Sequence, residues 1–125
     1  MKKLIATIVA LAALSPLAAS AEMVNDIRCT LNKGYTVPKL YAFQQSWMAA
    51  AKKQGYDEAA YKTKIFFPVY TEDTRTDPMV FLWRGTFASG EVWGKLGEWF
   101  PASGWVEKFN KVMNCSKAAL LIAPQ

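Results

Sequence analysis

The sequence contains no histidine. This absence excludes a Ser-His-Asp triad, a Cys-His nucleophile pair and any His-ligated zinc site. Cysteine is scarce too, with two residues in the chain, Cys29 and Cys115. If these two form a disulfide, thiolate metal sites are also excluded. We therefore predict no catalytic residues, no metal site and no cofactor.

Long apolar runs are equally rare, and the longest, Leu4–Leu14, is shorter than the roughly 20 residues that span a bilayer. Lys2 and Lys3 precede it, and small residues at 19–21 follow it, which is the layout of a secretory signal peptide. We predict a cleaved signal over 1–21 and a periplasmic or secreted protein. The alternative is a buried N-terminal helix.

The predicted mature chain begins at Glu22 and forms a single domain over 22–125. No cysteine follows the predicted cleavage site directly, so we expect neither a lipid anchor nor another membrane anchor. Without Lys2 and Lys3, 13 basic residues stand against 10 acidic ones, a net charge of +3. The basic residues are scattered, whereas nucleic-acid binders concentrate them on one face, so we expect no nucleic-acid partner.

Cys29 and Cys115 lie near the two ends of the mature chain. In an oxidising compartment such a pair is expected to form a disulfide. The chain-entropy model gives about 4.5 kcal/mol for closing so long a loop. The alternative is two separate buried thiols. Thioredoxin-type chemistry is not indicated, because it uses two cysteines separated by two residues.

The first half of the domain predicts a strand, a helix and a second strand. Apolar residues alternate with polar ones around Ile27–Leu31, as in a half-buried strand. Thr36 is the expected N-cap of a helix with one apolar stripe, which Gly55 ends. A strand follows over 61–70, and Pro68 within it predicts a sheet edge. The helix stripe consists of Leu40, Phe43, Trp47 and Ala51.

The second half repeats this order. The segment 79–87 is apolar on both faces, which predicts a central strand buried on two sides. Ser89 is the expected N-cap of a second helix, which ends at Pro101, and a short third helix follows over 105–113. The last strand is expected over 118–123. The order is β-α-β-β-α-β with an added short helix.

This order predicts an α+β fold, a four-stranded antiparallel sheet with two helices on one face. The first and last strands are neighbours in the usual strand order of this topology. That order brings Cys29 and Cys115 together, in agreement with the expected disulfide.

The strand Phe81-Leu82-Trp83-Arg84-Gly85-Thr86-Phe87, followed by a helix rich in Trp and Gly over 89–99, resembles the ferredoxin-like, dimeric α/β-barrel superfamily, and within it small exported bacterial proteins of unknown function. A similar rhythm occurs at 66–70. In that superfamily two sheets commonly pack face to face, so the resemblance implies a homodimer. Some members are haem enzymes or cofactor-free monooxygenases. A haem role with an axial histidine cannot be transferred to a chain without histidine, and no catalytic residue of the family is matched.

Two acidic clusters only weakly indicate a calcium site or a glycosidase carboxylate pair. The loop 71–78 holds Glu72, Asp73 and Asp77 but lacks the pattern of a calcium loop, and Arg75 is placed to neutralise the acids. Glu91 and Glu98 are two helical turns apart, or about 10 Å, somewhat beyond the widest spacing of glycosidase carboxylates. We interpret both clusters as ordinary solvated acids.

Aromatic residues are the strongest functional signal. Five tryptophans are many for so small a domain, and we interpret most as core or dimer interface. The alternative is an aromatic pocket for a small apolar or aromatic ligand between sheet and helices. Arg84 needs an anionic partner, either Glu98 or Asp77 within the chain or a ligand carboxylate. The candidate pocket residues are Trp83, Arg84, Tyr70, Trp47 and Trp99.

Two functions follow from these patterns. The favoured one is a non-enzymatic exported binding or interaction module, acting as a homodimer joined through its sheet. The alternative is a cofactor-independent, monooxygenase-like enzyme that acts on an aromatic or apolar substrate near Trp83, Arg84 and Tyr70. This alternative rests on the resemblance alone. A secreted enzyme inhibitor is compatible with the size and the disulfide.

Overall fold

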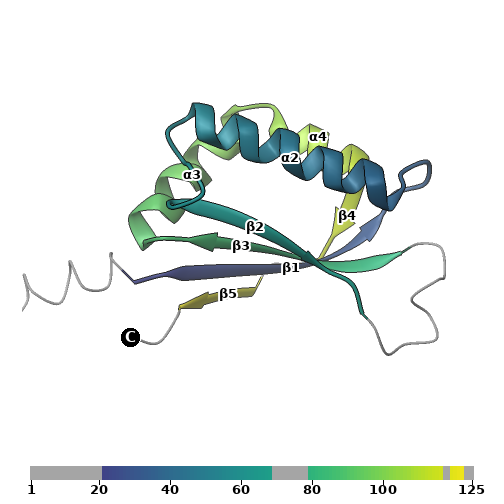
Figure 1. Ribbon diagram of the computed structural model, residues 1–125, viewed down its shortest axis with the longest axis horizontal. Helices are drawn as coiled ribbons and strands as arrows, with labels where there is room; N and C mark the ends of the chain where they lie inside the picture. The colour runs from purple at the N-terminus through teal and green to yellow at the C-terminus, as the bar shows by residue number, and fades with distance from the viewer. Residues whose placement is uncertain (1–20, 69–78, 117–118, 123–125) are drawn as a thin grey trace, which may run out of the picture.

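One antiparallel sheet carries three helices on a single face (Figure 1). The computed structural model describes residues 21–68, 79–116 and 119–122. The predicted signal peptide and the acidic loop 71–78 lie outside these residues. The elements in chain order are β1 (Met23–Leu31), α2 (Val37–Lys53), β2 (Tyr61–Phe66), β3 (Val80–Phe87), α3 (Gly90–Ala102), α4 (Trp105–Val112), β4 (Met113–Cys115) and β5 (Ala119–Ile122).

The strand order is β2-β3-β1, with β4 and β5 sharing the far edge of β1. β4 pairs with Cys29–Leu31 and β5 pairs with Met23–Asp26, all antiparallel. The predicted α+β class and the pairing of the first strand with the last are confirmed. The chain departs from a simple βαββαβ order near its C-terminal end. There α4 follows α3 directly, and two short strands stand in place of one.

The middle strand β3 shows how the sheet divides its side chains. Phe81, Trp83 and Phe87 point to the helices and are buried. Leu82 and Arg84 point to the other face and are only half-buried. The predicted central position of this strand is confirmed, but burial on both faces is not found, because all three helices cover the same face (Figure 1). Among the residues that the structure describes, no helix covers the opposite face of the sheet.

The edge strand β2 is shorter than the sequence predicts. It ends at Phe66, two residues before Pro68, and the part of the expected strand that includes Tyr70 lies outside the described residues. β2 is the edge of the sheet, as the proline predicts.

Local signals begin the helices as predicted, but α3 does not end at Pro101 as predicted, because Pro101 lies inside the helix, which ends at Ala102. The Thr36 hydroxyl accepts a hydrogen bond from the Lys39 amide at 3.4 Å, and the Ser89 hydroxyl accepts one from the Val92 amide at 3.2 Å. α3 and α4 are separated by Gly104, whose φ of 79° belongs to the left-handed region that glycine adopts most easily. The break at Gly104 turns the chain so that both helices lie over the sheet.

Cys29 and Cys115 are joined by a disulfide, as predicted. They lie directly opposite each other in the β1–β4 pairing. Cys29 is 1% exposed, so this end of the bridge belongs to the core. The bridge fixes the C-terminal edge of the sheet to its first strand.

Trp47 of α2 is the centre of the core, at 2% exposure. Its indole stacks on Trp99 with ring centres 5.7 Å apart. Four further rings meet it edge-on at 5.2 to 6.1 Å, a geometry that aromatic pairs favour. These are Tyr61, Phe100, Trp105 and Phe109. The interpretation of most tryptophans as core is confirmed for Trp47 and Trp83, while Trp93 is 39% exposed.

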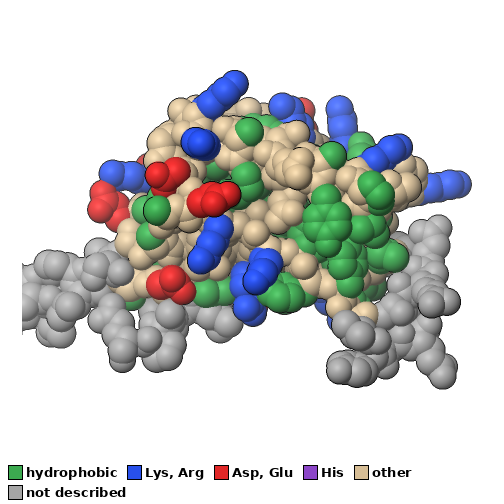
Figure 2. Space-filling model, viewed as in Figure 1, with side chains coloured by type: hydrophobic (Ala, Val, Ile, Leu, Met, Phe, Trp, Pro, Cys, Tyr) green, Lys and Arg blue, Asp and Glu red, His purple; other side chains and the backbone are tan. Residues whose placement is uncertain are grey.

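The described surface is mixed in charge. Figure 2 shows Lys and Arg side chains spread over the visible face rather than gathered in one patch, in agreement with the scattered sequence positions. Hydrophobic side chains gather where α2 begins and β2 ends (Figure 2). Tyr41 and Phe66, 42% and 38% exposed, belong to the two elements that meet there.

Candidate functional site

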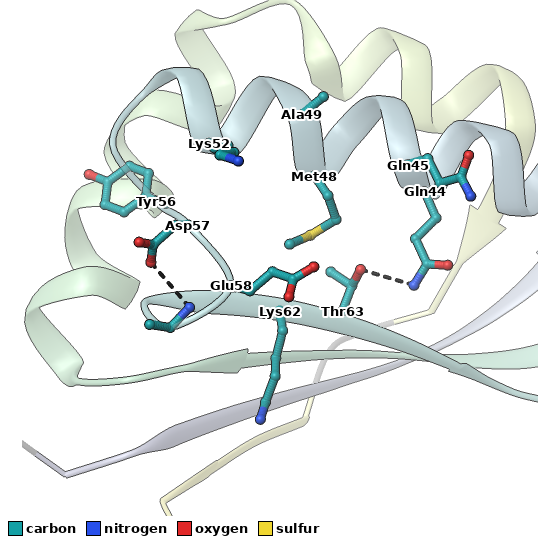
Figure 3. Close-up of a pocket in the computed structure, with 11 residues that line it drawn as sticks. Gln44, Gln45, Met48, Ala49, Lys52, Tyr56, Asp57, Glu58, Lys62 and Thr63 are labelled. Atoms are coloured by element: carbon teal, nitrogen blue, oxygen red, sulfur yellow. Dashed lines mark hydrogen bonds between the residues drawn. The ribbon is translucent and has the colours of Figure 1, made fainter.

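An open groove of about 640 Å³ lies between α2 and β2 (Figure 3). Three of its polar side chains have partners in the fold. The Gln44 amide donates to the Thr63 hydroxyl at 3.0 Å, and the Asp57 carboxylate accepts from two backbone amides at 3.1 Å. Its charges are mixed in sign, Lys52 and Lys62 against Asp57 and Glu58. The groove therefore does not gather reactive or like-charged groups that would indicate a catalytic or charged-ligand site.

A second hollow, which we call the aromatic cavity, lies between the inner face of the sheet and helices α3 and α4 and measures about 280 Å³. Most of its wall is aromatic or aliphatic. The sheet and α2 contribute Asn25, Ile27, Trp47, Tyr61, Trp83, Gly85 and Phe87. α3 and α4 contribute Trp93, Leu96, Gly97, Phe100, Val106, Phe109 and Asn110, and Met113 and Cys115 of β4 complete the wall.

Asn25 is the unusual residue of the aromatic cavity. It belongs to the inward-pointing positions of β1, among Met23, Ile27 and Cys29. Its side-chain oxygen Oδ1 is buried and has no hydrogen-bond partner within the described part of the chain. Leaving a buried polar group unpaired costs about 1–3 kcal/mol. The fold therefore holds a hydrogen-bond acceptor that its own side chains do not use.

Gly85 explains why Tyr61 can lie over the sheet at this point. Gly85 is directly opposite Asn25 in β1 and opposite Thr63 in β2. A Cβ atom at Gly85 would lie 3.3 Å from the Tyr61 ring, closer than side chains normally pack. The missing side chain lets the Tyr61 ring cover β3, where it packs against Phe87 with ring centres 4.8 Å apart.

The hydroxyl of Tyr61 is the second polar group on the wall. It accepts a hydrogen bond from Trp47 Nε1 at 2.9 Å. Burial raises the pKa of Tyr61 to about 12, so the phenol is neutral at physiological pH. It can bind or orient a ligand, but it is a poor general base.

The structure brings together part of the predicted pocket. Trp47 and Trp83 line the aromatic cavity. Trp99 stacks on Trp47 from outside the lining. Arg84 points to the open face of the sheet, away from the cavity, because neighbouring strand residues alternate sides. Tyr70 lies outside the residues that the structure describes.

Arg84 finds its anionic partner across the sheet. Its Nε and Nη2 donate to the two carboxylate oxygens of Asp26 at 2.7 and 2.9 Å. These bonds raise the pKa of Arg84. The guanidinium also lies over the Phe66 ring, 5.1 Å from its centre. Of the two partners expected within the chain, Glu98 does not pair with Arg84, and Asp77 lies outside the described residues.

Glu91 is engaged on the surface. It pairs with Lys95 one helical turn away at 2.7 Å, which lowers the pKa of Glu91. No group of three or more metal-ligating side chains occurs within 21–68, 79–116 and 119–122. Over the same ranges, none of the helices has the length and apolar character needed to cross a bilayer.

The sequence interpretation missed Asn25, Tyr61 and Gly85 as parts of one site. The available signal was Asn25, because extending the alternation of Ile27 and Cys29 back by one step puts a polar residue on the inward face. Tyr61 and Gly85 gave no comparable signal, since their contact depends on the pairing of β2 with β3.

No protein-family model, characterised protein or solved structure matches this chain. The function proposed below therefore rests on the geometry of the site and on the sequence pattern.

Proposed function

We propose that this protein is an exported, non-enzymatic binding module that takes a small apolar or aromatic molecule into the aromatic cavity. The observation that carries this proposal is the combination of an aromatic wall with an unused polar atom, the Oδ1 of Asn25. Small-molecule sites typically have this composition, a mostly apolar lining with a few polar groups that orient the ligand.

Export is supported by the disulfide. Bridges such as Cys29–Cys115 form and persist in oxidising compartments outside the cytosol. The layout of residues 1–21 supports a cleaved signal peptide that directs the chain there. Both features fit a periplasmic or secreted protein.

Binding is favoured over catalysis by the ionisation states around the cavity. Proton-transfer catalysis needs a group whose pKa lies near the working pH. Asn25 does not ionise in that range, and the pKa of Tyr61 is about 12. Arg84, which the enzyme hypothesis required, points to the other face of the sheet and is occupied by Asp26.

We further propose that two copies associate through their open sheet faces, as in the dimeric α/β-barrel superfamily. The order β2-β3-β1 with β4 at the far edge supports the ferredoxin-like relationship. The face contains apolar side chains, among them Val24, Val80 and Leu82, that the helices do not cover. The Asp26–Arg84 pair at its middle neutralises two charges that would otherwise oppose close approach.

Native mass spectrometry of the mature protein, purified without denaturation from its source, tests these proposals together. We expect a dimer that carries the disulfide and retains a small molecule. A protein that shows no bound molecule and binds nothing in a screen of small aromatic compounds would contradict the binding function.

The dimer surface has its own test. Leu82→Glu puts a charge on the open face and should shift the mass measured by light scattering from dimer to monomer. Tyr41→Glu is the matched control, since Tyr41 is an exposed apolar residue on α2, on the helical side of the molecule. A wild-type monomer at high concentration, or equal effects of both variants, would contradict the sheet-to-sheet dimer.

A further inference from the structure

We propose that the ligand of the aromatic cavity is a neutral, planar molecule of one or two fused rings whose single N–H or O–H donates a hydrogen bond to Asn25 Oδ1. Indoles and phenols are the chemical classes that satisfy this description. The inference rests on the proposed binding function and specifies the substance bound. Its first support is chemical: a carbonyl oxygen such as Oδ1 can only accept a hydrogen bond, so the ligand must donate one.

The burial of Oδ1 makes the site select ligands that carry a hydrogen-bond donor. In the structure this oxygen is covered and none of the described side chains pairs with it, so the Asn25 amide must turn toward the cavity before a ligand donor can reach it. A ligand with a donor converts an unpaired buried acceptor into a paired one. A ligand of the same shape without a donor fills the cavity and leaves the acceptor unpaired. Sites of this kind reject the analogue that lacks the polar group, because the penalty of the unpaired atom remains.

The cavity walls favour flat rings. Trp83 and Phe109 meet edge to face, with ring centres 5.3 Å apart and planes at 74°, and both line the cavity. Phe87 and Phe100 add two further aromatic faces or edges. Aromatic rings pack on one another in offset-stacked or edge-on arrangements, so an aromatic ligand continues the pattern that already holds this core together.

The size of the cavity and the absence of charge on its described wall narrow the class of ligand further. A volume of 280 Å³ lies just below the range of about 300–1,000 Å³ typical of sites for drug-sized ligands. It therefore fits a molecule of one or two rings. The described wall contains no Lys, Arg, Asp or Glu side chain. A charged ligand would lose its hydration without gaining an opposite charge, and this selects neutral molecules.

Entry is possible from the side of α3. Trp93 lines the cavity and is 39% exposed, so it belongs to both the cavity and the surface. Gly97, one turn later, leaves open space where a side chain would begin. A flat molecule can pass this part of the wall with little displacement of the helix.

The test compares two probes of nearly equal shape, indole, which has an N–H, and indene, which has a CH₂ in its place. Each is titrated into the ¹⁵N-labelled mature protein and followed by two-dimensional NMR. We expect both to shift signals of the cavity residues, with indole binding about tenfold more tightly, the value of one hydrogen bond to a buried acceptor. The side-chain NH₂ signals of Asn25 should shift further with indole than with indene.

Asn25→Leu removes the acceptor and keeps the side chain close to the same size. In this variant we expect the affinity for indole to fall to that for indene, and the indene affinity to be unchanged or higher. Asn32→Leu controls for the loss of any asparagine, because the Asn32 side chain donates to the Asn110 and Lys111 carbonyls instead. It should lower stability and keep the preference for indole.

The outcomes separate the two proposals. Equal binding of indole and indene to the wild-type protein, or a preference for indole that survives Asn25→Leu, would overturn the role of Asn25 and leave the binding function standing. Tighter binding of the acceptor 1-benzofuran than of indole would show that the amide presents its NH₂ group instead. Absence of binding by either probe, with an empty screen of aromatic compounds, would overturn both proposals.

Discussion

Asp26 and Arg84 face each other across β1 and β3 and form a two-point ion pair on the sheet face opposite the aromatic cavity. The two sides of one strand pair thus have different chemistry. One side has an ion pair with both carboxylate oxygens engaged, and the other has Asn25 next to Asp26 with an unpaired oxygen. The sheet separates a satisfied polar contact from an unsatisfied one.

Replacing Asp26 by Asn should have a small effect on the stability of the monomer, measured at protein concentrations too low for the proposed dimer to form. The Arg84 side chain is 39% exposed, so solvent screens the attraction even though Asp26 is only 14% exposed. We expect Asp26→Asn and Arg84→Met each to lower the free energy of unfolding by about 1 kcal/mol or less, with less loss at high salt. Urea denaturation at low and high ionic strength measures this. A loss of several kcal/mol would show that another molecule buries the pair even at these concentrations, as in a dimer.

Removing the Tyr61 hydroxyl should lower the free energy of unfolding by more than Asp26→Asn does. Tyr61→Phe leaves the Trp47 indole N–H, 2.9 Å from that oxygen, without its acceptor in the core. The expected loss is about 1–3 kcal/mol of unfolding free energy, measured by urea denaturation. Tyr41→Phe, at an exposed position, should change nothing. If both variants are equally stable, the Trp47–Tyr61 bond contributes no net stability.

The protein should lose stability at alkaline pH through Tyr61. In the unfolded chain this phenol ionises near its ordinary value of 10.0, whereas in the folded protein its pKa is about 12. Between these values the unfolded chain binds fewer protons, so the free energy of unfolding falls as pH rises, by at most about 1.4 kcal/mol per pH unit. Below pH 10 this contribution is complete and constant.

Two measurements check the alkaline prediction. Urea denaturation at about pH 9 and about pH 11 should show a smaller drop for Tyr61→Phe than for the wild type. Near-ultraviolet absorbance of phenolate should reveal one tyrosine that titrates late, and this step should be absent from Tyr61→Phe. A wild-type titration without a late step would contradict the burial of this hydroxyl.

Breaking the disulfide should be the most damaging single change. Cys29 and Cys115 are 86 residues apart, so their bond restricts nearly the whole unfolded domain. We expect the double Cys→Ala variant to lose about 2–5 kcal/mol of unfolding free energy, measured by urea denaturation. The wild-type protein in excess reductant should lose a similar amount. A variant as stable as the oxidised wild type would show that packing alone holds the two strands together.

Replacing glycine by alanine should raise stability inside α3 and lower it at Gly104, between α3 and α4. Gly94 and Gly97 are inside α3, and a Cβ at either meets nothing within 4 Å. Alanine at each should raise stability by up to about 1 kcal/mol. Gly104 has a φ of 79°, so alanine there should lower stability by about 1 kcal/mol. Thermal unfolding of the three variants measures both effects, and a loss at Gly94 or Gly97 would reveal an unseen contact.

Much of the fold could be predicted because the responsible signals are local. The caps at Thr36 and Ser89 act within one helical turn, and the stripe that includes Leu40 and Trp47 repeats within a single helix. The Cys29–Cys115 disulfide was predicted from the oxidising compartment, and the predicted strand order agreed with it. β4 was missed because three residues following a helix are too short to show a period.

The site could be predicted only in part. Trp47 and Trp83 line the aromatic cavity, since large aromatic side chains on inward faces must line whatever space the core leaves. Arg84 was assigned to the wrong side because its strand was expected to be buried on both faces, while the helices cover only one. The space near Asn25 arises from the pairing of three strands at Gly85, which no local pattern records.

The position of the disulfide has a mechanical consequence. A pulling force applied to the two ends of the domain enters β1 and the C-terminal strands and meets at the Cys29–Cys115 bond. Covalent sulfur then carries the load, and the segment 29–115, which holds α2, β2, β3, α3 and α4, experiences none. Under tension the chain can extend only by peeling β5 and the first part of β1 from the sheet. The aromatic cavity therefore lies almost entirely inside a force-shielded loop, so stretching the protein between its ends leaves most of the cavity wall in place.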